Sequence, residues 1–246
     1  MATNLLLIIS AVYLLAGFVK GFVGFGMPTI SMGLLALVMS PVQAAALLVV
    51  PAIITNLWQG LAGPYLRQIL KRLWPMFIGI LVGTWSGAGL MTGIKPWVAT
   101  LLLGLSLVIY AGLGLSSVHF RVPPQREAWL GPIIGAITGV ITAATGVFII
   151  PAVPYLQSLE MEKDELFQAL GLSFIVFSAA LAVNLSSAGA FENSSMPAVG
   201  MTLVMSFLGM FLGQKLRQKM DPIAFRRWFF IALLALGLVL MARGVI

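Results

Sequence analysis

A lysine inside a long apolar run is the first residue of this sequence that points to chemistry. Lys20 lies 16 residues after Asn4, where the run begins. A charged side chain at the centre of a bilayer costs at least about 2.5 to 3.5 kcal/mol on insertion scales, so such a residue is expected to have a function. We predict that Lys20 neutralises an anionic substrate. The alternatives are that it snorkels to the membrane interface or caps carbonyl groups at a helix break.

Glycines near Lys20 predict such a break. Gly21, Gly24 and Gly26 follow it closely, and Pro28 comes next. Glycine lets the backbone turn and lets a ligand approach the N–H groups. A helix that begins at a break presents unpaired N–H groups and the positive end of its dipole, and these bind anions. We therefore predict that the backbone at these glycines contributes to an anion site.

A second apolar run has a comparable break rich in hydroxyl groups. Its candidate substrate-binding residues are Thr138, Thr142, Thr145 and Gly146. The glycine offers the same backbone freedom as those of the first break, and the threonines offer hydroxyls. We expect the two breaks to face the substrate together.

Other polar or helix-breaking residues in apolar runs are weaker site candidates. Pro51 would free a backbone carbonyl, Ser173 and Ser178 offer hydroxyls, and Asn56 and Asn184 offer amides. Each has a structural alternative: a plain kink, a hydroxyl bonded to its own helix, or an amide that joins two helices.

The missing residue types exclude several classes of protein. No Asp, Glu or His lies inside an apolar run, and the chain contains no cysteine. It has no HExxH motif, no P-loop and no Ser-His-Asp set on suitable elements. We expect no catalytic residue, no metal site and no cofactor, so an enzyme is not expected. The acidic residues of 160–165 are expected to form a solvated loop and the start of a helix.

Composition places these residues in a membrane protein. The 246 residues are 60% hydrophobic and 9% charged, which is too apolar for a soluble globule. The net charge of +7 resides in short loops between apolar runs, so positive-inside topology explains it better than a nucleic-acid partner does. We predict an all-α polytopic protein whose principal partner is the lipid bilayer.

Eight apolar segments supply the expected elements. Six have the length of a single span, whereas the first and fifth are longer and broken by small residues, as in helical hairpins. The predicted segments are residues 4–39, 42–62, 73–93, 97–116, 129–158, 166–189, 196–214 and 224–244.

Matching residues predict that the chain consists of two related halves. Gly17 and Gly21 recur 118 residues later as Gly135 and Gly139, with Thr138 at the position of Lys20. At an offset of 126, Gly83 and Gly87 recur as Gly209 and Gly213, and Lys95-Pro96 recurs as Asp221-Pro222. We predict repeats at residues 1–120 and 121–246, each with one broken segment and three transmembrane helices.

Loop charges predict that these repeats are inverted. Basic residues concentrate in loops 63–72, 117–128 and 215–227, which are therefore expected to be cytoplasmic. The three loops share one side only if the fifth segment enters and leaves on that side. Loops 63–72 and 190–196 then lie on opposite sides, as in inverted-repeat transporters, and both termini lie outside.

Three glycine-rich stretches carry a resemblance to a known family: Gly17-Phe-Val-Lys-Gly-Phe-Val-Gly-Phe-Gly26, Gly135-Ala-Ile-Thr-Gly139 and Gly146-Val-Phe-Ile-Ile-Pro151. With these stretches in this order, the chain resembles over its whole length the TauE/SafE sulfite exporter family, also called 4-toluene sulfonate uptake permeases. The resemblance implies a permease of the bacterial inner membrane for sulfite, sulfoacetate, sulfonates or other small organic anions. Thr142-Ala-Ala-Thr145 departs from the denser glycine pattern of that family.

The sequence therefore predicts a secondary transporter that grips a small anion near the membrane midplane and works by alternating access. An inside-negative potential favours anion exit, so export is preferred to uptake, which would need a coupling ion, H⁺ or Na⁺. A passive anion channel and a membrane assembly subunit without transport activity remain alternatives. The substrate, the coupling ion and a homo-oligomeric state are left open.

Overall fold

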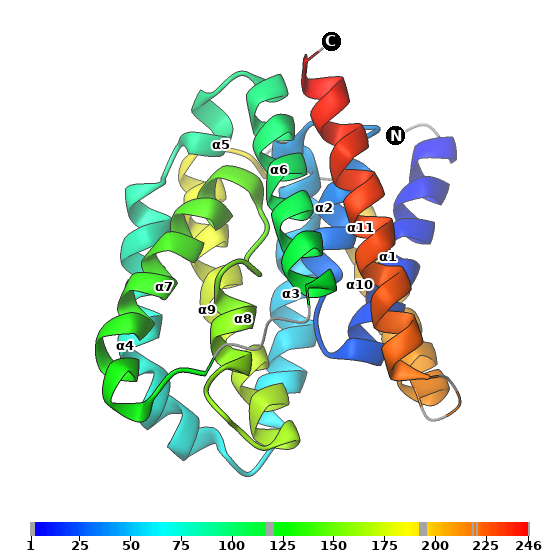
Figure 1. Ribbon diagram of the computed structural model, residues 1–246. Helices are drawn as coiled ribbons and strands as arrows, with labels where there is room; N and C mark the ends of the chain where they lie inside the picture. The colour runs from blue at the N-terminus through cyan, green and yellow to red at the C-terminus, as the bar shows by residue number, and fades with distance from the viewer. Residues whose placement is uncertain (1–2, 117–120, 192–195, 218, 220, 246) are drawn as a thin grey trace.

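The computed structural model describes residues 3–116, 121–191, 196–217, 219 and 221–245, and this part of the chain consists of helices joined by short connections (Figure 1). The first half contains α1 (Thr3–Val23), α2 (Met27–Leu35), α3 (Pro41–Leu61), α4 (Leu66–Ser86), α5 (Leu90–Gly93) and α6 (Pro96–Leu115). The second half contains α7 (Pro124–Thr145), α8 (Ala152–Gln157), α9 (Lys163–Ser187), α10 (Met196–Arg217) and α11 (Pro222–Val245).

Eight of these helices are long and apolar enough to cross a membrane. They are α1, α3, α4, α6, α7, α9, α10 and α11, whereas α2, α5 and α8 are too short. The prediction of an all-α polytopic membrane protein is confirmed. Local signals agree with the helix starts, since Ser40 and Gln43 form a capping box at α3 and Pro96 opens α6.

The two overlong segments each contain a full-length helix followed by a short one. Segment 4–39 folds into α1 and α2, and segment 129–158 folds into α7 and α8. Gly24 and Gly26 at the first break have φ values of 89° and 101°, and Gly146 at the second has φ of 72°. These left-handed conformations strongly favour glycine, which explains why the breaks occur there. In Figure 1 the chain leaves each break in the reverse direction, as expected of a hairpin.

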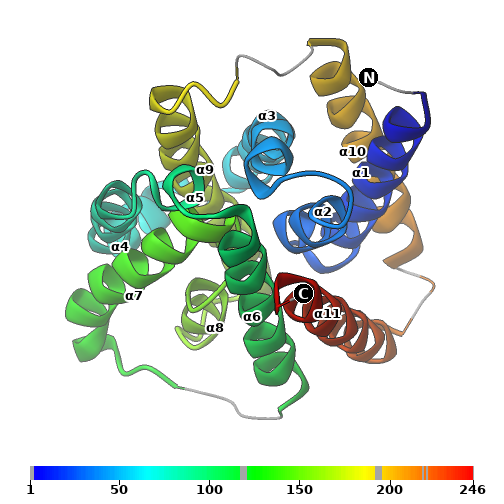
Figure 2. The same ribbon diagram turned by 90° about the horizontal axis from the view of Figure 1, so that it is seen from above.

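The long helices pack in pairs that join the two halves of the chain. Helix α1 packs against α10, α4 against α7, α3 against α9 and α6 against α11 (Figure 2). If α1 corresponds to α7 and α4 to α10, the first two pairs exchange partners between the halves. Such an exchange is what a two-fold relation between repeats requires.

Glycines set the close approach in the two exchanged pairs. A Cβ atom at Gly17 or Gly21 of α1 would overlap the α10 backbone, and one at Gly135 or Gly139 of α7 would overlap the α4 backbone. The corresponding stretches of α1 and α7, offset by 118 residues, therefore make the same kind of contact. Small residues at such interfaces let transmembrane helices pack backbone to backbone.

The register between α4 and α10 differs from the predicted one by a helical turn. Gly79 and Gly83 pack on α7 at Pro132 and Ala136, and Gly209 and Gly213 pack on α1 at Leu14 and Phe18. Leu14 and Pro132 are 118 residues apart, and so are Phe18 and Ala136. If α1 corresponds to α7 at this offset, Gly79 corresponds to Gly209 and Gly83 to Gly213, which is an offset of 130. The predicted offset of 126 was wrong for this element, since glycines four apart match equally well in either register.

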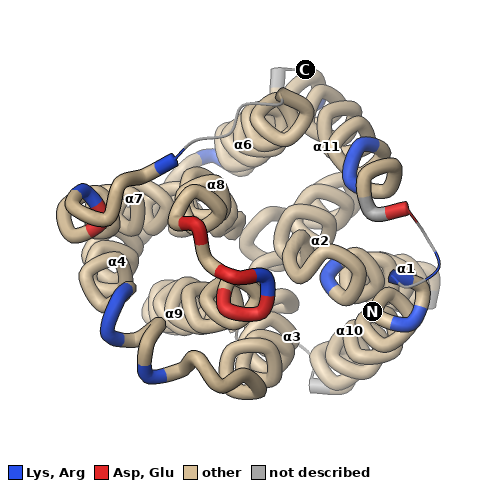
Figure 3. Tube along the Cα trace, turned by 60° about the horizontal axis from the view of Figure 1, so that its bottom comes forward, with Lys and Arg blue, Asp and Glu red and all other residues tan. Residues whose placement is uncertain are grey.

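The directions of the helices are those that inverted halves would have. In Figure 1, α1 and α3 run from the end that holds the termini towards the other end, whereas α7 and α9 run the opposite way. The described parts of the three basic loops lie together at the end opposite the termini (Figure 3), which we call the basic face. Residues 117–120, 218 and 220 of these loops and 192–195 of loop 190–196 lie outside the described residues. An inverted repeat, with halves at residues 1–120 and 121–246, stays a prediction.

An ion-pair network ties α4, α7 and α9 together at the basic face. Arg72 donates two hydrogen bonds to Glu127 at 2.8 and 2.7 Å and one to the carbonyl of Leu159 at 2.8 Å. Glu165 lies 3.9 Å from Arg72 and accepts a hydrogen bond from Gln68 at 3.0 Å. Glu165 is only 6% exposed, so the expectation of a wholly solvated acidic segment was wrong at this residue. Its partners lie on α4, too far along the chain for local sequence to show.

We expect a Gly83→Ala substitution to lower the free energy of unfolding by about 1 to 3 kcal/mol, because its methyl group would push α4 away from α7. Gly112→Ala in α6 is the matched control, since no atom lies within 4 Å of its Cβ position. Thermal denaturation in detergent compares the two. Equal melting temperatures would show that the α4–α7 contact tolerates a side chain.

Candidate functional site

Lys20 is buried in the last turn of α1 and is held by α3. Its side chain is 3% exposed, and its Nζ donates to Thr55 Oγ1 at 2.9 Å and to Asn56 Oδ1. The alternatives of snorkelling and of capping carbonyls at the break do not describe this geometry. Lys20 itself lies in the last turn of α1, and its acceptors Thr55 and Asn56 lie in the second half of α3.

The α3 backbone fixes the two acceptors. The Thr55 hydroxyl donates to the carbonyl of Pro51 at 2.6 Å, so its oxygen lone pairs remain free to accept from Lys20. Pro51 therefore contributes to the Lys20 site through its own carbonyl, which accepts the hydrogen bond of Thr55 one turn later. Sequence reasoning missed Thr55; its hydroxyl next to Asn56 in a span was the available signal.

Neutral oxygens alone do not compensate the charge of Lys20. Within the described ranges, three ion pairs occur, and none includes Lys20. An ammonium has three N–H donors, of which two are used here. Asn56 turns its Oδ1 to Lys20, and its amide nitrogen makes no hydrogen bond in the part of the chain that the structure describes. The site has donors left over, as an anion-binding site needs.

A small cavity lies beside these donors. It contains about 190 Å³ of space between atoms, with no room for a water-sized sphere. Lys20, Asn56 and Ala52 line one part, and Gly26, Met27 and Pro28 at the start of α2 line another. The first N–H groups of α2 have no partner within their helix, and its positive dipole end adds to the field of the ammonium. Gly26, its N-cap, provides no side-chain cap.

The linker between α1 and α2 closes this cavity with an aromatic ring. Phe25 lies between Gly24 and Gly26 and is 7% exposed. Gln59 of α3 donates hydrogen bonds to the carbonyls of Gly24 and Phe167, each at 2.9 Å. The linker is thus fastened to α3 and to the first turns of α9.

The threonines of the second break are bonded to their own helix. Thr138, Thr142 and Thr145 donate to carbonyls one turn earlier at 2.8, 2.7 and 2.7 Å. A Cβ at Gly146 would meet the side chain of Met32, which is more than a turn along α2 from the Lys20 cavity. None of these four residues is among the described residues that line the cavity. The structure therefore does not bring the two breaks together around Lys20.

The remaining candidates are also not among the described residues that line the cavity. Ser173 and Ser178 are buried with hydroxyls that have no partner among the described residues. Asn184 donates to the carbonyl of Thr84 at 2.7 Å and joins α9 to α4. Gly21 faces the α10 backbone and serves close packing there. Within the described residues, no group of His, Cys, Asp and Glu is placed to hold a metal ion.

Comparison with known proteins gives one result that covers nearly the whole chain. Residues 9–240 match the family described as "Sulfite exporter TauE/SafE". No curated protein sequence matches the chain significantly, and no solved structure does. The match includes most of both broken segments and all or most of each long helix, including the part of α1 that carries Lys20. The chain belongs to the sulfite exporter TauE/SafE family of membrane transporters.

Proposed function

We propose that this protein is a secondary transporter for a small sulfur-containing anion and that Lys20 binds the anion directly. The observation that carries the proposal is a buried ammonium with two neutral acceptors and no carboxylate partner among the described residues. Burying an unpaired charge is costly, so the site is expected to favour a ligand that supplies the missing negative charge.

The donors around Lys20 fit the oxygens of a sulfite or sulfonate group. One oxygen accepts from the free N–H of Lys20, and a second accepts from the amide nitrogen of Asn56. The N–H groups at the start of α2 face the same charge, as at other helix termini that bind anions. The family description supports sulfite as a member of this class. Thr138, Thr142, Thr145, Gly146, Ser173, Ser178 and Asn184 would contribute only in another conformation.

A carrier fits the closed cavity better than a passive channel does. The Lys20 cavity has no room for a water-sized sphere, so it is not part of an open aqueous path in this conformation. An anion of several atoms then enters only if neighbouring helices move. Alternating access, with one half rocking against the other, supplies such a movement, and the cross-half pairs α1–α10 and α4–α7 are the contacts that would rock.

Orientation and direction complete the proposal. Positive-inside topology in a bacterial inner membrane would put the basic face in the cytoplasm. The inside-negative potential favours anion export by about 2.3 kcal/mol per charge per 100 mV, so export needs no coupled ion. Uptake would require H⁺ or Na⁺. Oligomerisation is not needed for the Lys20 site, since one chain supplies all its groups.

We expect sulfite or sulfoacetate to raise the melting temperature of the purified protein in proportion to log concentration, because each binds only the folded form. Lys20→Met should abolish this shift and the anion flux into proteoliposomes. A membrane assembly subunit without transport activity would show no flux in either protein. Flux that survives Lys20→Met unchanged would contradict the role assigned to this residue, and single-channel current in planar bilayers would favour the channel.

We expect Asn56→Asp to place a permanent counter-charge on Lys20 and so to displace the anion. With sulfite present, the melting temperature of Asn56→Asp should not rise. Without ligand, its melting temperature should be at least as high as that of Asn56→Leu, because the new carboxylate pairs with Lys20. Asn56→Leu is the control that removes the acceptor without adding charge. If Asn56→Asp still binds sulfite as the unmodified protein does, the anion does not occupy the place next to Asn56.

A further inference from the structure

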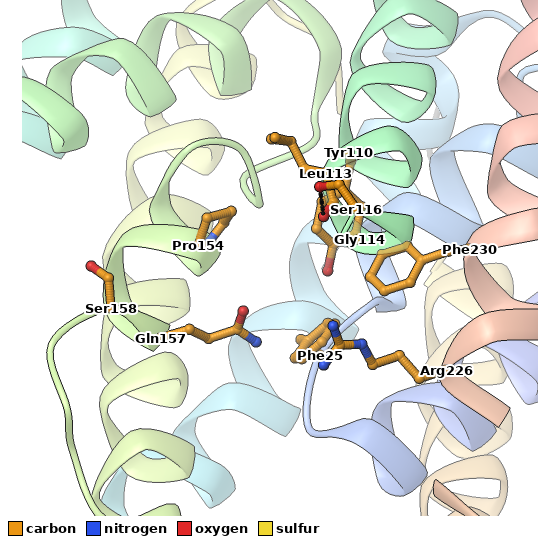
Figure 4. Close-up of a pocket in the computed structure, with 10 residues that line it drawn as sticks. All are labelled: Phe25, Tyr110, Leu113, Gly114, Ser116, Pro154, Gln157, Ser158, Arg226 and Phe230. Carbon is orange, nitrogen blue, oxygen red and sulfur yellow. Dashed lines mark hydrogen bonds between the residues drawn. The ribbon is translucent and has the colours of Figure 1, made fainter. Parts of the chain in front are cut away.

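A second cavity opens on the basic face, outside Phe25. It has a volume of about 880 Å³, including space open to solvent, and we call it the vestibule. Its lining comes from α8, α6, α11 and the α1–α2 linker, with Gln157, Tyr110, Arg226 and Phe25 among the side chains (Figure 4). Phe25 also lines the Lys20 cavity, so this one residue borders both spaces.

The vestibule contains one positively charged donor, Arg226, together with neutral polar side chains such as Gln157. Arg226 has no carboxylate partner among the described residues, and its guanidinium lies 5.9 Å from the centre of the Phe230 ring. Figure 4 shows Gln157 and Arg226 extending towards each other from opposite sides, with Phe25 between them. Tyr110 is 3% exposed, and its hydroxyl has no hydrogen-bond partner in the described part of the chain.

The charge of the vestibule is positive at its exposed end. No acidic side chain is among its described lining residues. A neighbouring cavity shares Phe25 and Gln157 with it and adds Arg217 and Lys163 against one acid, Asp164. A concave surface with one sign of charge concentrates ions of the opposite sign and speeds their capture.

Resting on the transport function proposed above, we propose that the vestibule is a second anion-binding site, in which Arg226 and Gln157 hold a sulfonate or sulfite group before it passes Phe25 to reach Lys20. Arg226 supplies charge and a planar pair of donors that suits two oxygens of such a group. Gln157 supplies a neutral donor from the opposite side. Phe25 separates the two sites until the α1–α2 linker moves at its two glycines.

Cysteine labelling tests the vestibule without requiring transport. The chain has no cysteine, so Leu113→Cys places a single thiol in the vestibule lining. The rates of its reaction with anionic methanethiosulfonate ethylsulfonate and with the cationic trimethylammonium analogue report the local potential. We expect Arg226→Gln to lower the anionic-to-cationic rate ratio about sixfold, since the anionic rate falls and the cationic rate rises by about 2.4-fold each, as for a charge roughly 8 Å away in water. Arg227→Gln is the matched control, since Arg227 is exposed and does not line the vestibule.

Methanesulfonate, which does not react with thiols, serves as the competing ligand. It should slow the labelling of Leu113→Cys in the protein that keeps Arg226, and equally when Lys20→Met is added. It should not slow the labelling when Arg226→Gln is added. If Arg226→Gln and Arg227→Gln give the same rate ratio and the same protection, the vestibule is not an anion site. That result would leave the flux loss in Lys20→Met, and hence the proposed function, intact.

A thiol behind Phe25 tests the separation of the two sites. Ala52 lines the Lys20 cavity and is 1% exposed. Ala52→Cys should react slowly with the anionic reagent, and faster when Phe25→Ala or Phe25→Leu is added. Phe230→Ala is the aromatic control, because Phe230 lines the vestibule only. Equal rates in all these backgrounds, with monodisperse protein in each, would overturn the role of Phe25.

Discussion

The positive charge of Lys20, buried without a counter-ion among the described residues, is the constraint on which this site depends. The ammonium is stable there because Thr55 and Asn56 accept its hydrogen bonds and because it lies in the last turn of α1, where helix carbonyls concentrate negative partial charge. These acceptors hold the side chain but do not neutralise it. A charge that is held and only partly compensated is suited to bind and release an anion, whereas a carboxylate partner would compete with the ligand.

The short α1–α2 linker brings opposite helix ends to this charge. The end of α1 stabilises Lys20, and the start of α2, where helix N–H groups lack partners within their own helix, lines the space beside it. Gly24 and Gly26 make so short a connection possible, and Gln59 fastens it to α3. The glycine contact between α1 and α10 then fixes the helix that carries Lys20. A movement of α1 against α10 would therefore change the surroundings of Lys20 and Phe25 together.

Sequence reasoning predicted the elements better than their contacts. Length, hydropathy and residue type are local properties of the sequence. They predict the apolar runs, the two breaks and a charged residue, Lys20, inside an apolar run. The hydrogen bonds of Lys20 to Thr55 and Asn56 depend on which face of α3 meets α1, and periodicity does not give that in segments that are apolar on nearly every side. For the same reason, the Thr142–Gly146 break was expected next to Lys20, whereas its threonines bond to their own helix and Gly146 packs on Met32. The burial of Glu165 by α4 was missed because its partners Arg72 and Gln68 are distant in sequence.

The most direct measurement of the central claim is an experimental structure of the protein with selenite, a heavier analogue of sulfite whose selenium is located by anomalous scattering. The account predicts a selenium peak beside Lys20, with oxygens at about 2.7 to 3.2 Å from Nζ and from the Asn56 amide nitrogen. It also predicts that Phe25 or its flanking glycines shift to make room. Selenium bound elsewhere, with the Lys20 cavity unoccupied at saturating selenite, would contradict the account.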